Sequence, residues 1–501
     1  FVTDCICHPG LISFRVTIMK QITPLQGSTP LYLNIADQLV SMIDEGTFRT
    51  GDRLPSIRSL SNQFKVSINT VKSVYSLLED RCVIEAKPQS GYYVRPKLPA
   101  LPEDLDIDTL DIVPSEVAST DLVMRLMQDA LDPEMVQFGA AIPAPDLIPI
   151  TRINRMLSSA SKRYAHESVS YTMPPGCRKL RTQIAKRLIK AGCVLNPDEI
   201  VITTGATEAV YLALRTICSA GDTVAVGSPL YFTFIHMFKE LGLRVLEIPS
   251  SPLSGINLEA LQSAFEQNKV DACLIISNFN NPLGISISDD KKRALAALAQ
   301  THDIPLIEDD INGDLSFDDE RPTLIKTWDK NEHVLLCSSF SKTIAPGYRV
   351  GWIASGKYIE QIKKQKLLTS LASPSPTQLA IAEFLDVGGY DHHLRKVRKQ
   401  YSIRSAQMAD AVGRYFPEGT RVSKPEGGFT LWVELPERVD ATGMYAEAIR
   451  KGITIAPGSV FSTTQNFNHC LRLNAAFWSD DYLWAIQQLG ESASGIMDNI
   501  S

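Results

Sequence analysis

Six short apolar runs in the middle of the chain constrain its fold more than any other feature of the sequence. They are rich in β-branched residues, apolar on both faces and mostly separated by helix-like segments. The six runs are EIVIT (199–203), TVAVG (223–227), ACLIIS (272–277), IPLIE (304–308), VLLCS (334–338) and VGWIA (350–354). Strands of this kind that alternate with helices are typical of a mainly parallel sheet covered by helices. The sequence therefore predicts a large α/β domain, in which a ligand lies at the carboxyl ends of the strands.

Polar residues follow four of these runs, at the positions where the strands end. An aldehyde cofactor with a phosphate and a pyridine nitrogen needs such a set: a Schiff-base lysine, a carboxylate for the ring nitrogen, and amides, hydroxyls and an arginine for the phosphate. Alone, each has an ordinary structural explanation, such as a helix cap, a turn or a surface lysine. Together they predict a cofactor site, drawn from Thr204, Gly205, Ala206, Thr207, the turn 278–284, Asp309, Asp310, Ser339, Ser341, Lys342 and Arg349.

Residues 20–97 form a second zone with a different charge. Ten basic residues stand against seven acidic ones, a formal charge of +3, although the whole chain has a net charge of −6. Three helix-like segments precede two β-rich runs around a Pro/Ser/Gly turn, an order that predicts a winged helix-turn-helix. The third helix of such a domain enters the major groove of double-stranded DNA. A small helical domain that binds another protein is the alternative.

The segments outside these zones carry less information. Residues 98–124 contain seven acidic and no basic residues, which predicts an extended linker. Residues 1–18 are interpreted as a non-native or misassigned extension. The nine cysteines are scattered without a CxxC pair, so we expect reduced thiols in a cytoplasmic protein and no metal site. No apolar run reaches the roughly 18 residues that cross a bilayer, so we expect no membrane association.

The basic zone resembles the DNA-binding head of the GntR superfamily. The stretches GDRLPSIRSL, VSINTVKSVYSLLED and SGYYV match that family in order. Relatives often have arginine where this chain has Ile68 and Lys72, which indicates weaker guanine recognition than a bidentate arginine provides. The resemblance implies that DNA is contacted by Arg58, Ser67, Asn69, Thr70, Lys72 and Gly91.

The larger zone resembles the fold-type I aminotransferases, from about Tyr171 to Arg472. The family pattern SxSKxxxPGxRxGW is present from Ser339 to Trp352. The fusion of this zone to a GntR head resembles the MocR-type regulators. That resemblance implies a pyridoxal 5'-phosphate (PLP) binding domain over 125–495, with a small C-terminal α+β lobe at about 396–495, and a homodimer.

The same resemblance implies a role for each site residue. Lys342 is the PLP Schiff-base lysine, Asp309 pairs with the pyridine nitrogen and Asn281 binds the ring 3-oxygen. Tyr231 stacks on the ring, and Arg472 binds a substrate carboxylate. The phosphate is held by Gly205, Ala206, Thr207, Ser339, Ser341 and Arg349, together with Tyr171 of the neighbouring subunit.

One position departs from the aminotransferase pattern. Relatives have a tyrosine two or three residues after the aspartate, and this chain has Ile311 and Asn312 there. An amide does not replace an ionisable phenol, so transamination stays an open question. We expect a transcription regulator that senses an amine, an amino acid or PLP itself. An active aminotransferase with an attached head, and a repressor whose body is a cofactor-free dimerisation scaffold, are the alternatives.

Overall fold

The computed structural model of the chain comprises two compact units, Phe1–Lys97 and Leu98–Ser501. The structure describes residues 31–44, 47–48, 51–81, 83–87, 91–95, 100–102, 114, 121–129, 132–267, 270–464 and 466–498. The extension predicted at 1–18 and most of the linker predicted at 98–124 lie outside these ranges. Within them, no helix is both long and apolar enough to cross a membrane.

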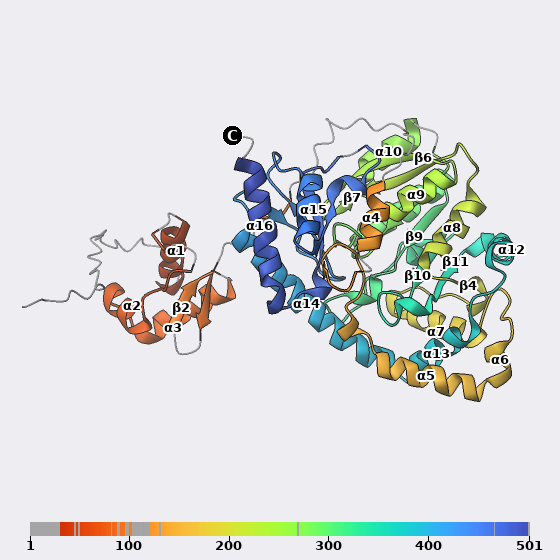
Figure 1. Cartoon of the computed structure of the whole chain (residues 1–501), viewed down its shortest axis with the longest axis horizontal. Coiled ribbons are helices and arrows are strands. Elements are labelled where there is room, and N and C mark those ends of the chain that lie inside the picture. The colour runs from red at the N-terminus through yellow and green to blue at the C-terminus, as the bar shows by residue number, and fades with distance from the viewer. Residues whose placement is uncertain are drawn as a thin grey trace, which may run out of the picture. The chain divides into compact units, whose positions relative to one another are not determined.

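The first unit has three helices and a hairpin, in the order expected of a winged helix-turn-helix (Figure 1). Its elements are α1 (Leu31–Asp44), α2 (Ile57–Phe64), α3 (Ile68–Asp80), β1 (Ile84–Lys87) and β2 (Gly91–Val94). Ser56 and Ser67 cap α2 and α3, each accepting a hydrogen bond from the N–H three residues on.

The core of this unit lies where the three helices meet the hairpin. Tyr75 of α3 is fully buried, donates its hydroxyl to the carbonyl of Pro55 (2.6 Å) and packs on Tyr92 of the hairpin. The N–H of Leu54 donates to the carbonyl of Tyr92 (2.8 Å), so the segment before α2 is tied to the hairpin. The hairpin and the third helix are therefore held in one rigid arrangement.

The second unit contains the predicted sheet of mainly parallel strands. Its eight strands lie in the order β4-β11-β10-β9-β8-β5-β6-β7. Strands β6, β5, β8, β9 and β10 pair in parallel, whereas β11 is antiparallel to both β10 and β4. The bounds are β4 (Ile200–Thr203), β5 (Thr223–Ser228), β6 (Arg244–Ser251), β7 (Gly255–Ile256), β8 (Ala272–Ile276), β9 (Leu306–Asp309), β10 (Val334–Ser339) and β11 (Gly351–Ala354).

Helices cover both faces of this sheet (Figure 1). Alternate residues of each strand face opposite helix layers, which explains why the strands are apolar on both faces. One face is covered by α8 (Ala206–Ile217), α9 (Phe232–Glu240) and α12 (Ile359–Ser370). The other is covered by α7 (Arg178–Leu188), α10 (Leu258–Gln267), α11 (Asp289–Thr301) and α13 (Ser375–Asp386). Helices α5 (Ile150–Arg163) and α6 (Ala165–Val169) contact α13.

A smaller α+β lobe follows the long helix α14 (Gly389–Tyr415). Its four-stranded sheet has the order β12-β13-β16-β15. Residues from α4 and β3, far earlier in the chain, pack into the core of this lobe. The bounds are α4 (Asp121–Asp129), β3 (Val136–Gln137), β12 (Arg421–Val422), β13 (Thr430–Glu434), α15 (Ala441–Arg450), β14 (Ile453–Thr454), β15 (Ala456–Pro457), β16 (Cys470–Asn474) and α16 (Leu483–Asp498).

Candidate functional site

The carboxyl edge of the large sheet gathers the polar turns that the sequence singled out. Strand β9 pairs with β10 so that Asp309 lies opposite Cys337, close to the turn that holds Lys342. Strand β11 is antiparallel, so its beginning lies at this same edge, where Gly351 pairs with Thr203. A Cβ on Gly351 would lie 2.4 Å from the carbonyl carbon of Gly205. Only glycine permits this close approach of the two turns.

Lys342 lies in a partly buried position at this edge. Its Nζ donates to the carbonyl of Ala141 (2.6 Å). Burial lowers the pKa of Lys342 to about 8; the positive charges of Arg472 and Arg349 act in the same direction, and Asp309 opposes them. A lysine with a pKa this low has a much larger neutral fraction near neutral pH than an ordinary lysine, and the neutral amine is the form that attacks a carbonyl group.

Asp309 is 4% exposed and accepts a hydrogen bond from the N–H of Ile311 (3.1 Å). Burial raises the pKa of its carboxyl to about 7; Asp310 and Glu308 raise it further, whereas the Ile311 N–H and Lys342 lower it. A carboxyl group in this state can share a proton with a basic nitrogen at neutral pH.

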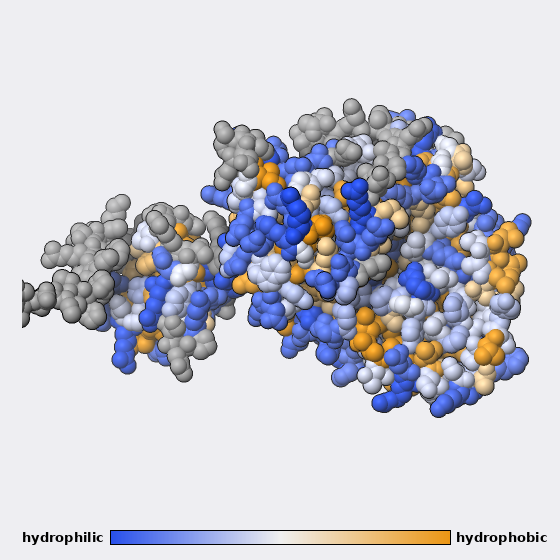
Figure 2. Space-filling view, in the orientation of Figure 1, coloured by the Kyte–Doolittle hydropathy of each residue, from blue (hydrophilic) through white to orange (hydrophobic). Residues whose placement is uncertain are grey.

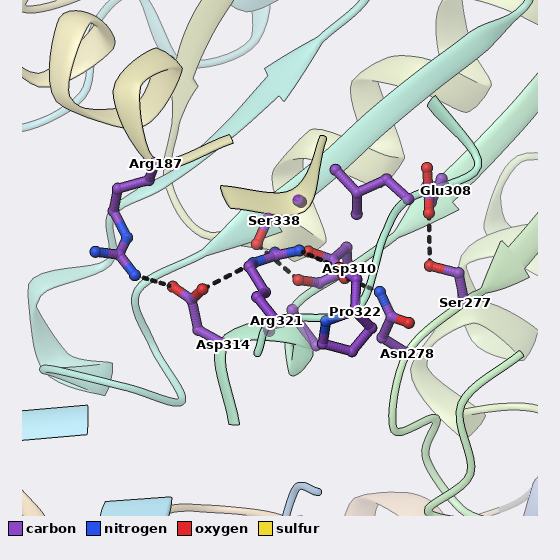
Figure 3. A network of polar contacts seen from close by, with 12 residues as sticks. Arg187, Ser277, Asn278, Glu308, Asp310, Asp314, Arg321, Pro322 and Ser338 are labelled. Carbon is purple, nitrogen blue, oxygen red and sulfur yellow. Dashed lines mark hydrogen bonds and ion pairs between the residues drawn. The ribbon is translucent and has the colours of Figure 1, made fainter. Parts of the chain in front are cut away.

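Asp310, the next residue in the sequence, belongs to a chain of largely buried ion pairs (Figure 3). Arg321 pairs with Asp310 through Nη2 and with Asp314 through Nε (2.8 Å), and Arg187 pairs with Asp314 (3.3 Å). Asn278 donates from Nδ2 to Asp310 (2.7 Å). Burial would raise the pKa of Asp314, but Arg187 and Arg321 outweigh it and hold that pKa well below its usual range. These groups neutralise one another and support the loop that follows β9.

Glu308 anchors the next turn of the same loop. Its carboxyl accepts hydrogen bonds from Ser277 Oγ (2.5 Å), Ile325 N (2.8 Å) and Lys326 N (2.9 Å). Burial raises the pKa of Glu308 to about 7, and Asp310 adds to the effect. Glu308 and Asp310 thus bind the protein's own backbone and side chains, while Asp309 between them points to the other face.

The turn between β4 and α8 forms an anion cradle. Arg349 donates from Nη2 to the carbonyl of Thr204 (3.2 Å) and from Nη1 to Ser341 Oγ (3.3 Å). A Cβ on Gly205 would lie 2.3 Å from Arg349 Nη2, so the guanidinium uses the space that glycine leaves. The N–H groups at the start of α8 and this guanidinium are donors of the kind that bind a phosphate.

Arg472 of β16 is fully buried at the side of the site that the small lobe forms. It donates from Nη1 to Asn281 Oδ1 (2.9 Å) and from Nη2 to the carbonyl of Gly139. Its Nε is buried and has no hydrogen-bond partner among the described residues. Burial lowers the pKa of Arg472 to about 10. A guanidinium held in this way can bind the carboxylate of a ligand by donating hydrogen bonds to it.

Two tyrosines predicted for the site have different surroundings. Tyr231 is partly buried. Burial raises its pKa; the charge of Arg472 lowers it and that of Asp309 raises it. Tyr171 is 78% exposed on the surface of the protomer. At the position of the missing phenol, Asn312 donates from Nδ2 to the carbonyl of Phe279 (2.9 Å). Asn312 thus binds the backbone of the turn that carries Asn281.

The structure also adds a segment that sequence reasoning missed. The carbonyls of residues 139–142 line the site: Gly139 accepts from Arg472, Ala141 from Lys342, and Ala140 and Ile142 from Asn474 Nδ2 (2.6 and 2.9 Å). Backbone acceptors have no sequence signature. The available signal is the run of small residues and prolines GAAIPAP, which follows β3.

The DNA-contact residues predicted in the head lie on its surface. Arg58 near the start of α2, and Asn69 and Lys72 on α3, are exposed, as expected for a groove-reading face. Ser67 also caps α3 and contacts Thr70 Oγ1 (2.8 Å). The predicted contacts did not include Arg53, whose guanidinium lies beside the wing: a Cβ on Gly91 would be 3.1 Å from Arg53 Nε.

Comparisons with known proteins agree with both units. Residues 31–94 match the family "Bacterial regulatory proteins, gntR family", and residues 152–485 match the family "Aminotransferase class I and II". Members of the second family bind PLP.

Two relatives align with nearly the whole of this chain. The chain is 38% identical to the uncharacterized HTH-type transcriptional regulator YdcR of Escherichia coli (strain K12), over 92% of this chain and 98% of that protein. It is also 38% identical to the regulator YjiR of the same strain, over 93% of this chain and 99% of that protein. The solved structure of a multiple substrate aminotransferase from Thermococcus profundus superposes with a TM-score of 0.71 at 26% identity, over 76% of this chain and 96% of that one.

Proposed function

Since this chain belongs to the aminotransferase class I and II family and, with its gntR-family head, is a DNA-binding transcription regulator of the MocR type, we propose that its body binds PLP and senses an amine, an amino acid or PLP itself. The regulator would act beside the chromosome, in the cytoplasm. The observation that supports the proposal most directly is the partly buried Lys342, with its pKa lowered to about 8, at the edge that also holds Asp309 and Arg349.

The groups at the edge of the sheet fit PLP. Gly205, Ala206, Thr207, Ser339, Ser341 and Arg349 would hold the phosphate, Asp309 the ring nitrogen, Asn281 the ring 3-oxygen and Tyr231 the ring face. When bound, PLP supplies an aldehyde that combines reversibly with amines and a ring that withdraws electrons. Lys342 would provide the amine that holds the aldehyde, and its lowered pKa keeps part of that amine neutral.

A homodimer belongs to the same proposal. Tyr171, Thr207 and Arg349 are exposed in the single protomer, so the phosphate cradle is open on one side. Hydrophobic side chains gather over α12 and α6 (Figure 2), among them Leu368, which is 71% exposed. A second copy would cover this apolar surface, and its Tyr171 would reach the open cradle.

Sensing requires that the ligand prefer one of two states of the dimer. A ligand amine would take the place of the Lys342 amine at the PLP aldehyde and leave Lys342 free. A ligand carboxylate would bind Arg472 of the small lobe. Since Arg472 also holds the carbonyl of Gly139, the ligand would compete with a contact between the lobe and the segment over the site. One head, with a formal charge of +3, should bind DNA weakly, and two heads at a fixed spacing would multiply the affinity.

An active aminotransferase is the second candidate, and the lowered pKa of Lys342 together with the carboxylate-binding position of Arg472 favours it. Asn312 in place of the expected tyrosine is against it. Keto-acid formation across a panel of amino acids separates the two. Turnover at rates typical of enzymes, about 1 per second or more, would identify the chain as an enzyme.

The test of the proposed function is the visible spectrum of the purified full-length protein after addition of PLP. We expect an absorbance band in the visible range that is absent from Lys342→Ala and present in the matched control Lys363→Ala, which changes a lysine of α12 paired with Glu360 (2.8 Å). Amines and amino acids should shift the band and change operator affinity in the wild type only. A protein without a visible band would support the scaffold alternative.

A further inference from the structure

A carboxylate lies next to the phosphate cradle, where its charge opposes phosphate binding. Glu208 is the third residue of α8, directly after Ala206 and Thr207. Its Oε2 accepts from the N–H of Thr204 (2.5 Å), so the side chain folds back onto the cradle turn itself. The helix dipole attracts an anion to this end of α8, and an uncompensated Glu208 would reduce that attraction.

Lys366 supplies the compensating charge. Its Nζ lies 2.7 Å from Glu208 Oε2, and its side chain is 1% exposed. Ser370, one turn further along α12, donates to Glu208 Oε1 (2.7 Å) and accepts from Lys366 Nζ (2.8 Å). Burial would raise the pKa of Glu208, but the hydrogen bonds from Lys366, Ser370 and Thr204 lower it below the usual value, so the carboxyl is ionised at neutral pH.

The pair also positions the cradle. Thr204 contacts Lys366 Nζ through Oγ1 (3.5 Å) and Ser373 Oγ through the same oxygen (3.4 Å), while its carbonyl accepts from Arg349. The turn that carries Gly205 is therefore fixed by α12 on one side and by the phosphate arginine on the other. A buried ion pair is weak evidence for net stability, and in some proteins its benefit is a defined geometry.

We propose that Lys366 is a positioning residue for the cofactor phosphate: it neutralises Glu208 and holds the Thr204–Gly205 turn, so that the cradle stays favourable to a dianion. This inference rests on the proposed PLP site and adds a residue outside it. Lys366 does not touch the phosphate. It acts through Glu208, so the loss of PLP affinity that follows from removing Lys366 should be reversed when the charge of Glu208 is removed as well.

The test compares PLP with pyridoxal, which carries no phosphate, by titrating the full-length protein and following its absorbance. In Lys366→Met the affinity for PLP should fall by about tenfold or more, the affinity for pyridoxal should change little, and inorganic phosphate should compete less well. Glu208→Gln/Lys366→Met removes both charges and should recover PLP affinity to within about threefold of the wild type. The matched control is Lys363→Met, one turn earlier on α12, whose partner is the exposed Glu360.

Three results would overturn the inference. Equal losses for PLP and pyridoxal in Lys366→Met would indicate a general packing defect. No loss of PLP affinity would show that the pair does not act on the phosphate, and a double variant as weak as Lys366→Met would show that Lys366 does not act through Glu208. A wild-type protein that binds neither compound would instead contradict the proposed function itself.

Discussion

Asp309 and Asp310 are neighbours at the end of β9, yet their surroundings are opposite. Asp309 faces the site near Lys342, and among the described residues it forms no ion pair; its polar contact is the N–H of Ile311. Asp310 faces the other way, where Arg321 and Asn278 bind it (Figure 3). Burial raises the pKa of both carboxyls. At Asp310 the charge of Arg321 and the hydrogen bond from Asn278 oppose the rise. Asp310 is occupied by these partners and supports the loop, whereas Asp309 remains available to a ligand. The two residues are of the same type, so it is their hydrogen-bond and ion-pair partners that give Asp309 to the ligand site and Asp310 to the support of the loop.

The largest expected effect comes from removing Arg321, the cation that pairs with Asp310 and Asp314. Arg321→Met leaves Asp310 and Asp314 buried without their shared partner, so the free energy of unfolding should fall by about 3–5 kcal/mol. Chemical denaturation of the full-length protein measures it, with Arg293→Met as the control, since Arg293 pairs with an exposed Asp290. Equal effects of the two substitutions would contradict the comparison.

Stability should also depend on pH through Asp309. Because the pKa of Asp309 is raised to about 7 in the folded protein and lies near 4 in an unfolded chain, the folded state binds the extra proton between these values. Stability of the cofactor-free protein therefore falls as pH rises from about 4 to about 7, by as much as about 4 kcal/mol for this group.

Asp309→Asn removes that loss. Between about pH 5 and about pH 8 the folded wild type loses the proton of Asp309 and, with it, stability. The variant has no such proton, so its stability relative to the wild type should rise over this range. Denaturation at the two pH values measures the difference. The pKa values of Glu308 and Asp310 are raised as well, but their contributions cancel because both proteins contain these residues. A difference that does not change with pH would show that Asp309 titrates at its ordinary value.

Asp310→Asn should have a smaller effect than Arg321→Met. The variant keeps Arg321 paired with Asp314 and loses one charged partner, so we expect a loss of about 1–3 kcal/mol. The visible band with PLP should remain, because the site lies on the other face. Loss of the band with unchanged stability would reverse the roles assigned to the two carboxylates.

The smallest effect is expected at Lys292, which is fully buried behind the same network. Its Nζ donates to Asn278 Oδ1 (2.8 Å), but Ser286 Oγ donates to that oxygen as well (2.8 Å). Burial lowers the pKa of Lys292, although Glu308 and Asp310 raise it. Lys292→Met keeps the volume and leaves Asn278 bonded, so stability should change by less than about 1 kcal/mol. A loss as large as that of Arg321→Met would make Lys292 an essential member of the network.

Much of this site followed from local sequence pattern. The apolar runs predicted the strands, and parallel strands bring their carboxyl ends to one edge, so the amino-acid order alone was enough to group Asp309, Lys342 and the turn at Gly205. Arg349 joins them because β11 runs antiparallel and begins at that edge. The head was predictable for a similar reason, since its helices, turn and hairpin are contiguous in sequence.

Tertiary structure alone decided which charges are compensated and which carbonyls line the site. Ala141 accepts from Lys342 across about two hundred positions, and Lys366 reaches Glu208 from another helix. Strand and helix periodicity describes one segment at a time, whereas an ion pair joins two segments through the packing of the whole domain. The sequence thus determined where the candidate groups lie along the sheet edge, and the fold determined which of them remain available to a ligand.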